Sequence, residues 1–167
     1  MTSKQVIECL GLQPLPGEGG YYRQTYKSAG KIPAQALPEH DGPRAFGTAI
    51  YYLVTPESFS ALHWVPQDEV FHFYLGDPVE MFQIHPDGQA RTCVIGPDLE
   101  KGQRPQAVAP GKVWQGTRLV EGGAWALLGC TVCPGFEFAD FRLEKRDALI
   151  ARFPQHSERI RLFTHAL

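Results

Sequence analysis

Turn-forming residues interrupt this chain at short intervals, and this spacing is the strongest constraint on its fold. The clearest breaks are 55–57 (Thr-Pro-Glu), 86–88 (Pro-Asp-Gly), 122–123 (Gly-Gly) and 134–135 (Pro-Gly). Breaks at this spacing are typical of antiparallel sandwiches and barrels, and not of alternating helices and strands. We therefore expect a protein that is mostly β-strand.

Helices are predicted only at the two ends of the chain. Ser3 can cap a short helix that Gly11 ends, and helical apolar spacing returns at 143–153 and 157–162. Proline, glycine and polar residues predict a surface loop at 28–43. We expect one domain over residues 1–167, with an all-β jelly-roll barrel at about 21–142 and a helical tail at about 143–167. The predicted strands are 21–26, 45–54, 58–65, 70–75, 79–85, 90–95, 106–108, 115–120, 124–132 and 137–142.

Length and composition fit a single core. The chain has 167 residues, of which 43% are hydrophobic, and its net charge is -2. Without a basic run, it gives no electrostatic reason to expect nucleic acid or an anionic membrane as a partner. No apolar run approaches the ~20 residues that cross a bilayer, and the first residues lack the features of a signal peptide. The sequence therefore predicts a cytoplasmic protein.

Four cysteines fit a reducing compartment, in which scattered thiols stay free. Cys130 and Cys133 form a CxxC within an apolar run, where the three-residue offset points the two thiols to opposite faces of a strand. We therefore interpret them as buried core cysteines, and not as a zinc or redox site.

The stretch 59–76, FSALHWVPQDEVFHFYLG, combines strand-type alternation, a turn and a cluster of ionisable side chains. Alternation gives His63 a defined face of the first strand and Glu69 a defined face of the second. His72 falls on the opposite face unless a bulge intervenes, so an outer or subunit-interface position is favoured over a pocket position.

The same stretch resembles the first signature motif of the cupin superfamily, in which HxH is followed by a glutamate and a glycine. His63 and Glu69 match two of its ligands, and Val65 stands at the second histidine. The segment 109–114, APGKVW, resembles the second cupin motif, with Trp114 in the place of its histidine. With the blocks 18–26, 48–53, 68–80, 109–115 and 129–141, the chain resembles a single-domain family of uncharacterised bacterial and fungal cupins. That family is related in fold to dTDP-sugar epimerases and seed storage proteins, which implies a double-stranded β-helix, the cupin jelly roll.

The metal ligands of the cupin motifs are only half present. Catalytic zinc and iron sites generally use three protein ligands, and neither Val65 nor Trp114 can coordinate. We therefore predict no metal and no other cofactor. Without a metal, a histidine beside a carboxylate suits proton transfer, because its unperturbed pKa near ~6.5 lies close to working pH. The resemblance to the metal-free epimerases implies that His63 is the general base and that Glu69 orients it.

Further residues are candidates for binding a substrate. Trp114 can stack on a ring or a sugar face, and the other candidates can supply hydrogen bonds or charge if they face inward. The candidates are Arg23, His72, Gln83, Trp114, Glu137 and Asp140.

Three functions are compatible with such a cavity. The first is a metal-free isomerase or epimerase acting on a sugar-like or nucleotide-linked metabolite. The second is a non-catalytic module that binds a small polar metabolite, and the third is a metal-dependent enzyme that uses His63, Glu69 and His72. We also predict a symmetric homodimer, because the strand 46–54, FGTAIYYLV, lacks the lysines that blunt an exposed sheet edge. The cupin resemblance implies pairing through such strands.

Overall fold

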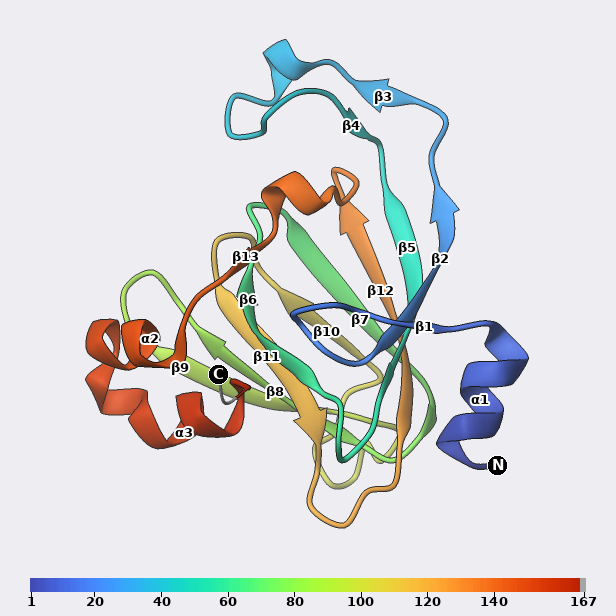
Figure 1. Ribbon diagram of the computed structural model, residues 1–167. Coiled ribbons are helices and arrows are strands. Elements are labelled where there is room, and N and C mark those ends of the chain that lie inside the picture. Colours follow the sequence, from blue (N-terminus) through green and yellow to red (C-terminus); the bar gives the residue numbers. More distant parts are fainter. Residues whose placement is uncertain (166–167) are drawn as a thin grey trace.

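Two antiparallel β-sheets form the body of the protein, which the computed structural model describes for residues 1–165 (Figure 1). The predicted all-β jelly roll is confirmed. The larger sheet has the order β1 (Gln13–Pro14), β2 (Tyr21–Lys27), β5 (Thr48–Val54), β12 (Ala126–Cys133), β7 (Asp68–Gly76), β10 (Gln106–Ala109). The smaller sheet has the order β13 (Arg142–Leu143), β6 (Ser60–Trp64), β11 (Trp114–Leu119), β8 (Val79–Ile84), β9 (Ala90–Ile95).

The main core lies between the two sheets and follows the alternation of the strands. On β12, Leu128, Cys130 and Val132 belong to this core, whereas Leu127 packs with a separate cluster on the other face of the sheet. The same alternation leaves Cys130 buried and Cys133 exposed. The prediction of opposite faces is thus confirmed, but Cys133 is not a core residue, because its face of β12 is turned away from the smaller sheet.

Short helices cover the outer faces of both sheets. Helix α1 (Ser3–Leu10) packs with the larger sheet through Val6, next to Leu53 of β5. Thr2 caps it rather than Ser3, because the Thr2 hydroxyl accepts from the Gln5 amide at 3.3 Å. In the tail, α2 (Arg146–Arg152) and α3 (Ser157–Leu162) pack on the smaller sheet. None of the helices described is long and apolar enough to cross a membrane.

Residues 28–43 do not form a plain loop. They contain β3 (Lys31–Ile32) and a 3₁₀ helix (Ala34–Ala36), and β3 pairs with β4 (Arg44–Ala45). Figure 1 shows this hairpin as an arm that projects beyond the ends of β2 and β5.

Two strand predictions are wrong. The predicted strand 137–142 is instead a 3₁₀ helix (Phe138–Asp140) followed by β13. The Asp140 carboxylate accepts hydrogen bonds from Arg44 and Gln67, and these contacts hold the segment in a turn rather than in an extended strand.

The strand that includes 48–54 is not a sheet edge, since β5 pairs with β2 on one side and β12 on the other. The premise of the homodimer prediction is therefore wrong, and the homodimer itself stays a prediction.

Candidate functional site

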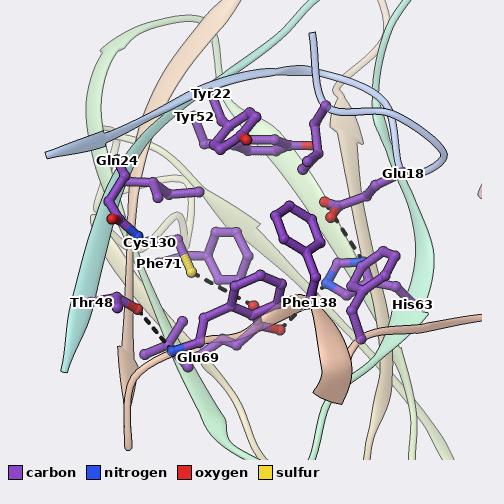
Figure 2. Close-up of a pocket in the computed structure, with 15 residues that line it drawn as sticks. Glu18, Tyr22, Gln24, Thr48, Tyr52, His63, Glu69, Phe71, Cys130 and Phe138 are labelled. Atoms are coloured by element: carbon purple, nitrogen blue, oxygen red, sulfur yellow. Dashed lines mark hydrogen bonds and ion pairs between the residues drawn. The ribbon is translucent and has the colours of Figure 1, made fainter. Parts of the chain in front are cut away.

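A cavity of about 270 Å³ lies against the inner face of the larger sheet (Figure 2). Strands β2, β5, β7 and β12 supply one wall, and the segment between β12 and β13 supplies another. Most of the lining is aromatic or aliphatic, with a few polar groups among it. The aromatic lining residues are Tyr22, Tyr52, Phe71, Phe136, Phe138 and Phe141, and the polar or ionisable ones include Glu18, Gln24, Thr48, His63, Glu69 and Cys130.

His63 and Glu69 meet in this cavity, as the cupin resemblance implies. His63 is only 2% exposed, and its Nε2 lies 3.4 Å from Glu69 Oε2. Its Nδ1 donates to the Ala61 carbonyl at 2.9 Å, which fixes one proton on that nitrogen. The ring lies against Phe141, with centroids 5.3 Å apart. These contacts leave the imidazole in one orientation between the two sheets.

Glu18 is a second buried carboxylate that sequence reasoning missed. Its Oε1 accepts from the Ser60 hydroxyl at 2.7 Å and lies 3.7 Å from His63 Nδ1. Gly17 and Gly19 flank it with φ of 82° and 99°, and this backbone folds the loop inward so that the side chain points at the barrel. A single charged residue among glycines, directly before an aromatic strand, is the only signal that the sequence carries.

Gln115 joins His63 to Glu69 and was also missed. Its amide nitrogen lies 2.7 Å from both His63 Nε2 and Glu69 Oε2. With the amide in this orientation, Nε2 accepts, and the imidazole is neutral. When His63 carries a second proton on Nε2, that proton can bond to Glu69 Oε2 at 3.4 Å or, if the amide turns over, to Gln115 Oε1. That oxygen is buried and has no other partner within residues 1–165.

The two carboxylates govern the protonation of His63. Burial alone would lower the pKa of His63, but the Glu18 charge, then the hydrogen bond and charge of Glu69, raise it to about 9. Burial also raises the pKa of Glu18, against the opposing effect of His63. The pKa of the Cys130 thiol is raised well above its usual range by burial, so it remains a neutral S–H beside Glu69.

Two of the residues predicted to bind substrate lie on the outer face of the larger sheet. His72 contacts Thr131 at 3.2 Å and Gln106 at 3.3 Å, on the face opposite Glu69. Arg23 is exposed and lies over the Tyr51 ring. Their assignment to the pocket is wrong, because strand alternation without a local bulge turns both away from the cavity.

Trp114 and Gln83 are buried but do not line the cavity. Trp114 lies on the outer face of the smaller sheet, where it packs with Phe82 and Leu149 beneath the tail helices. Its neighbour Gln115 takes the inner face instead. The Gln83 amide donates to the Val108 carbonyl at 2.9 Å. This hydrogen bond links β8 to β10 and occupies the Gln83 side chain.

Glu137 and Asp140 lie near the cavity but turn away from it. Glu137 is exposed and pairs with Lys27 at 2.6 Å. Asp140 is buried and accepts from Arg44 at 2.8 and 2.6 Å and from Gln67 at 2.6 Å. Asp140 therefore ties the base of the arm and the turn after β6 to the segment that carries Phe138 and closes the cavity.

The structure contradicts the metal site that was the third interpretation. His72 points away from His63 and Glu69, so the three side chains cannot share an ion. Glu18 cannot replace His72, because Glu18 and Glu69 approach opposite nitrogens of the same ring. Over residues 1–165, no group of three His, Cys, Asp or Glu side chains is arranged to hold a metal.

Comparisons with known proteins agree with this fold. Residues 4–144 match the family model described as Cupin superfamily (DUF985). An uncharacterised protein of Saccharomyces cerevisiae, YML079W, is 29% identical in an alignment 133 residues long, and the match covers 74% of this chain and 66% of the yeast protein. The chain thus spans slightly under two thirds of that relative.

Two solved structures resemble the whole chain. A hypothetical protein from Leishmania major is 31% identical with a TM-score of 0.91, and the match covers 99% of this chain and 100% of that one. Protein SO0799 from Shewanella oneidensis is 30% identical with a TM-score of 0.89, covering 100% and 99%. The chain therefore belongs to the DUF985 family of the cupin superfamily.

Proposed function

We propose that this protein is a metal-free isomerase that moves a proton between two atoms of a small metabolite held in the aromatic cavity. The observation that carries the proposal is the position of His63 between two buried carboxylates, 3.4 Å from Glu69 and 3.7 Å from Glu18. Buried acid–base groups that interact in a cavity are costly to a fold and are common at catalytic sites.

Glu69 is the base in this proposal, and His63 is a positioning residue. Both ring nitrogens of His63 already have protein partners, Ala61 at Nδ1 and Gln115 at Nε2. Glu69 Oε2 faces the Gln115 amide at 2.7 Å and His63 Nε2 at 3.4 Å, whereas among the described residues Glu69 Oε1 has only the weakly donating Cys130 thiol at 3.8 Å. Glu69 Oε1 is thus the atom free to meet a substrate. This reverses the roles expected from the sequence.

The chemistry that suits one free carboxylate oxygen is a one-base 1,3-proton transfer. Glu69 Oε1 takes a proton from a carbon next to a C=N group or an unsaturated carbonyl group. The C–H bond breaks, and its electron pair spreads over the conjugated system. The same oxygen delivers a proton, either the one it took or one exchanged with solvent, to a second carbon, where a new C–H bond forms and the double bond shifts. Atoms and electrons balance without an oxidant or a cofactor, and the His63 imidazolium offsets the buried Glu69 charge.

The cavity size favours a compact substrate. Ligand pockets commonly measure roughly 300–1,000 Å³, and this one is about 270 Å³. The sugar-like metabolite of the first interpretation is compatible with that volume. A nucleotide-linked one would have to leave its nucleotide outside.

A deuterium-exchange experiment tests the proposal. Metabolites that co-purify with the untagged protein are identified by mass spectrometry, with Ile50→Trp, which fills the cavity, as the reference for non-specific carriage. The protein–metabolite mixture is then incubated in D₂O. We expect the wild type to incorporate deuterium at a carbon atom of the metabolite. With Glu69→Gln, the rate of incorporation should be about 10²–10⁴-fold lower.

Glu137→Gln is the matched control, because it makes the same change on an exposed glutamate outside the cavity. It should exchange at the wild-type rate. A metabolite that is bound but, with the wild type, neither gains deuterium nor converts to an isomer would overturn the isomerase and favour the non-catalytic binding module. Equal rates in wild type and Glu69→Gln would show that Glu69 is not the base.

A further inference from the structure

Acidic and aromatic side chains dominate the lining of the cavity. Its ionisable residues include Glu18, Glu69 and His63, and among residues 1–165 no lysine or arginine contributes to the lining. We propose that the ligand of this cavity is a compact organic cation, such as a protonated amine or imine or a quaternary ammonium, held by aromatic rings and the buried carboxylates. This inference rests on the proposed function, because it takes the same cavity as the ligand site.

The first support is an imbalance of charge. When His63 is an imidazolium, it compensates one carboxylate, but Glu18 and Glu69 are both buried, at 7% and 6% exposure. An uncompensated carboxylate among apolar side chains is costly, which is why burial raises the pKa of Glu18, and a cationic ligand removes that cost. A phosphate or carboxylate ligand would add to it. The charge of the site therefore argues against anionic substrates, including nucleotide-linked ones.

The second support is an unsatisfied acceptor that faces the ligand space. Glu69 Oε1 has the Cys130 thiol at 3.8 Å as its hydrogen-bonding contact, and the thiol keeps its proton. A thiol is a weak donor and leaves most of the acceptor capacity of a carboxylate unused. An N–H donor of a protonated amine, or the diffuse charge of a quaternary ammonium, would complete this contact.

The third support is the set of aromatic faces around the carboxylates. Tyr22 and Tyr52 lie along one side of the cavity in Figure 2, and Phe71 and Phe138 lie nearer Glu69. Aromatic rings attract cations through the negative potential of their faces, and cages of this kind recognise quaternary ammonium groups. Phe138 is 57% exposed, so this ring stands at the mouth. A bound cation would also acidify adjacent C–H bonds, which suits the proposed proton transfer.

Matched probes of different charge test the inference. The first series is choline, its neutral carbon analogue 3,3-dimethylbutan-1-ol, and the anion 3,3-dimethylbutanoate. The second is piperidinium, cyclohexanol and cyclohexanecarboxylate. Binding to the wild-type protein is measured by calorimetry and by saturation-transfer NMR. We expect the cation of at least one series to bind tenfold or more tightly than its neutral analogue, and the anion to bind weakest.

Variants locate the effect. Glu69→Gln and Glu18→Gln should each reduce the preference for the cation over its neutral analogue, whereas Glu137→Gln should preserve it. Equal binding of cation and neutral analogue in both series, tighter binding of an anion, or no cation binding at millimolar concentration would overturn the inference. Deuterium exchange into a neutral or anionic metabolite would refute the inference of a cationic ligand but would agree with the proposed isomerase. Cation binding with neither deuterium exchange nor isomer formation would refute the isomerase and leave the cationic ligand standing.

Discussion

Removing either carboxylate from the site should lower the pKa of His63. The pKa lies near 9 against an ordinary 6.5, although burial acts in the opposite direction. A shift of roughly 2.5 units corresponds to roughly 3 kcal/mol, so Glu18, Glu69 and the hydrogen bond to the Ala61 carbonyl together must supply more than this. For comparison, two unit charges about 4 Å apart interact by about 4 kcal/mol at an effective dielectric constant of 20. We expect Glu18→Gln or Glu69→Gln alone to lower the pKa by at least about one unit.

The double variant gives a sharper result, because it changes the sign of the shift. With both charges removed, burial is the largest remaining influence, and the pKa of His63 should fall below 6.5. The assay is an NMR titration of ¹⁵N-labelled histidine rings, with His63 assigned by His63→Gln. His72 is the internal control, because its ring lies on the other face of the sheet. A His63 pKa that stays near 9 in both single variants would refute the assignment of its cause.

The same shift predicts a pH dependence of stability. Because the pKa of His63 is raised in the folded state, its contribution is fully present below pH 6.5 and is lost as the pH rises through about 9. The difference in free energy of unfolding between wild type and His63→Gln, measured with urea, should therefore shrink by up to roughly 3 kcal/mol across that window. A constant difference would contradict a buried imidazolium.

Other predictions concern the surroundings of the site. Asp140→Asn leaves the buried Arg44 without its counter-charge and should cost about 3–5 kcal/mol by urea denaturation. Burial raises the pKa of Asp140, but Arg44 and Gln67 together outweigh it and lower that pKa, so the loss of stability should diminish in acid as the wild type protonates. A loss under about 1 kcal/mol would contradict the pairing. Trp114→Leu should lower the free energy of unfolding by about 1–3 kcal/mol, because it leaves a cavity under the tail helices, and ligand affinity should stay unchanged. Weaker ligand binding without a loss of stability would place Trp114 in the site. The predicted homodimer should appear as a doubled mass in analytical ultracentrifugation at micromolar concentration, and a monomeric mass would refute it. Its structural reason is the edge strand β10, on or near which Tyr74 and Val108 are 46% and 49% exposed.

Much of the fold was readable from local patterns. The cupin resemblance placed His63 and Glu69 in one cavity, whereas turn residues and alternation predicted most of the strands and turned His72 away from Glu69. Those predictions succeed because the side-chain period of a strand is two residues, so relative faces follow from spacing alone. The cupin motifs added the barrel itself, which the solved structures of similar chains support.

The remaining site residues depend on tertiary structure. Alternation says that Trp114 and Gln115 lie on opposite faces, but only the packing of the tail helices decides that Trp114 faces out and Gln115 faces His63. Glu18 and Asp140 lie outside regular strands, where no period constrains a side chain. Their directions follow from a glycine-rich turn and from the ion pair with Arg44, contacts between segments far apart in the sequence. Sequence periodicity thus determines which residues share a face, and long-range packing determines which face becomes the site.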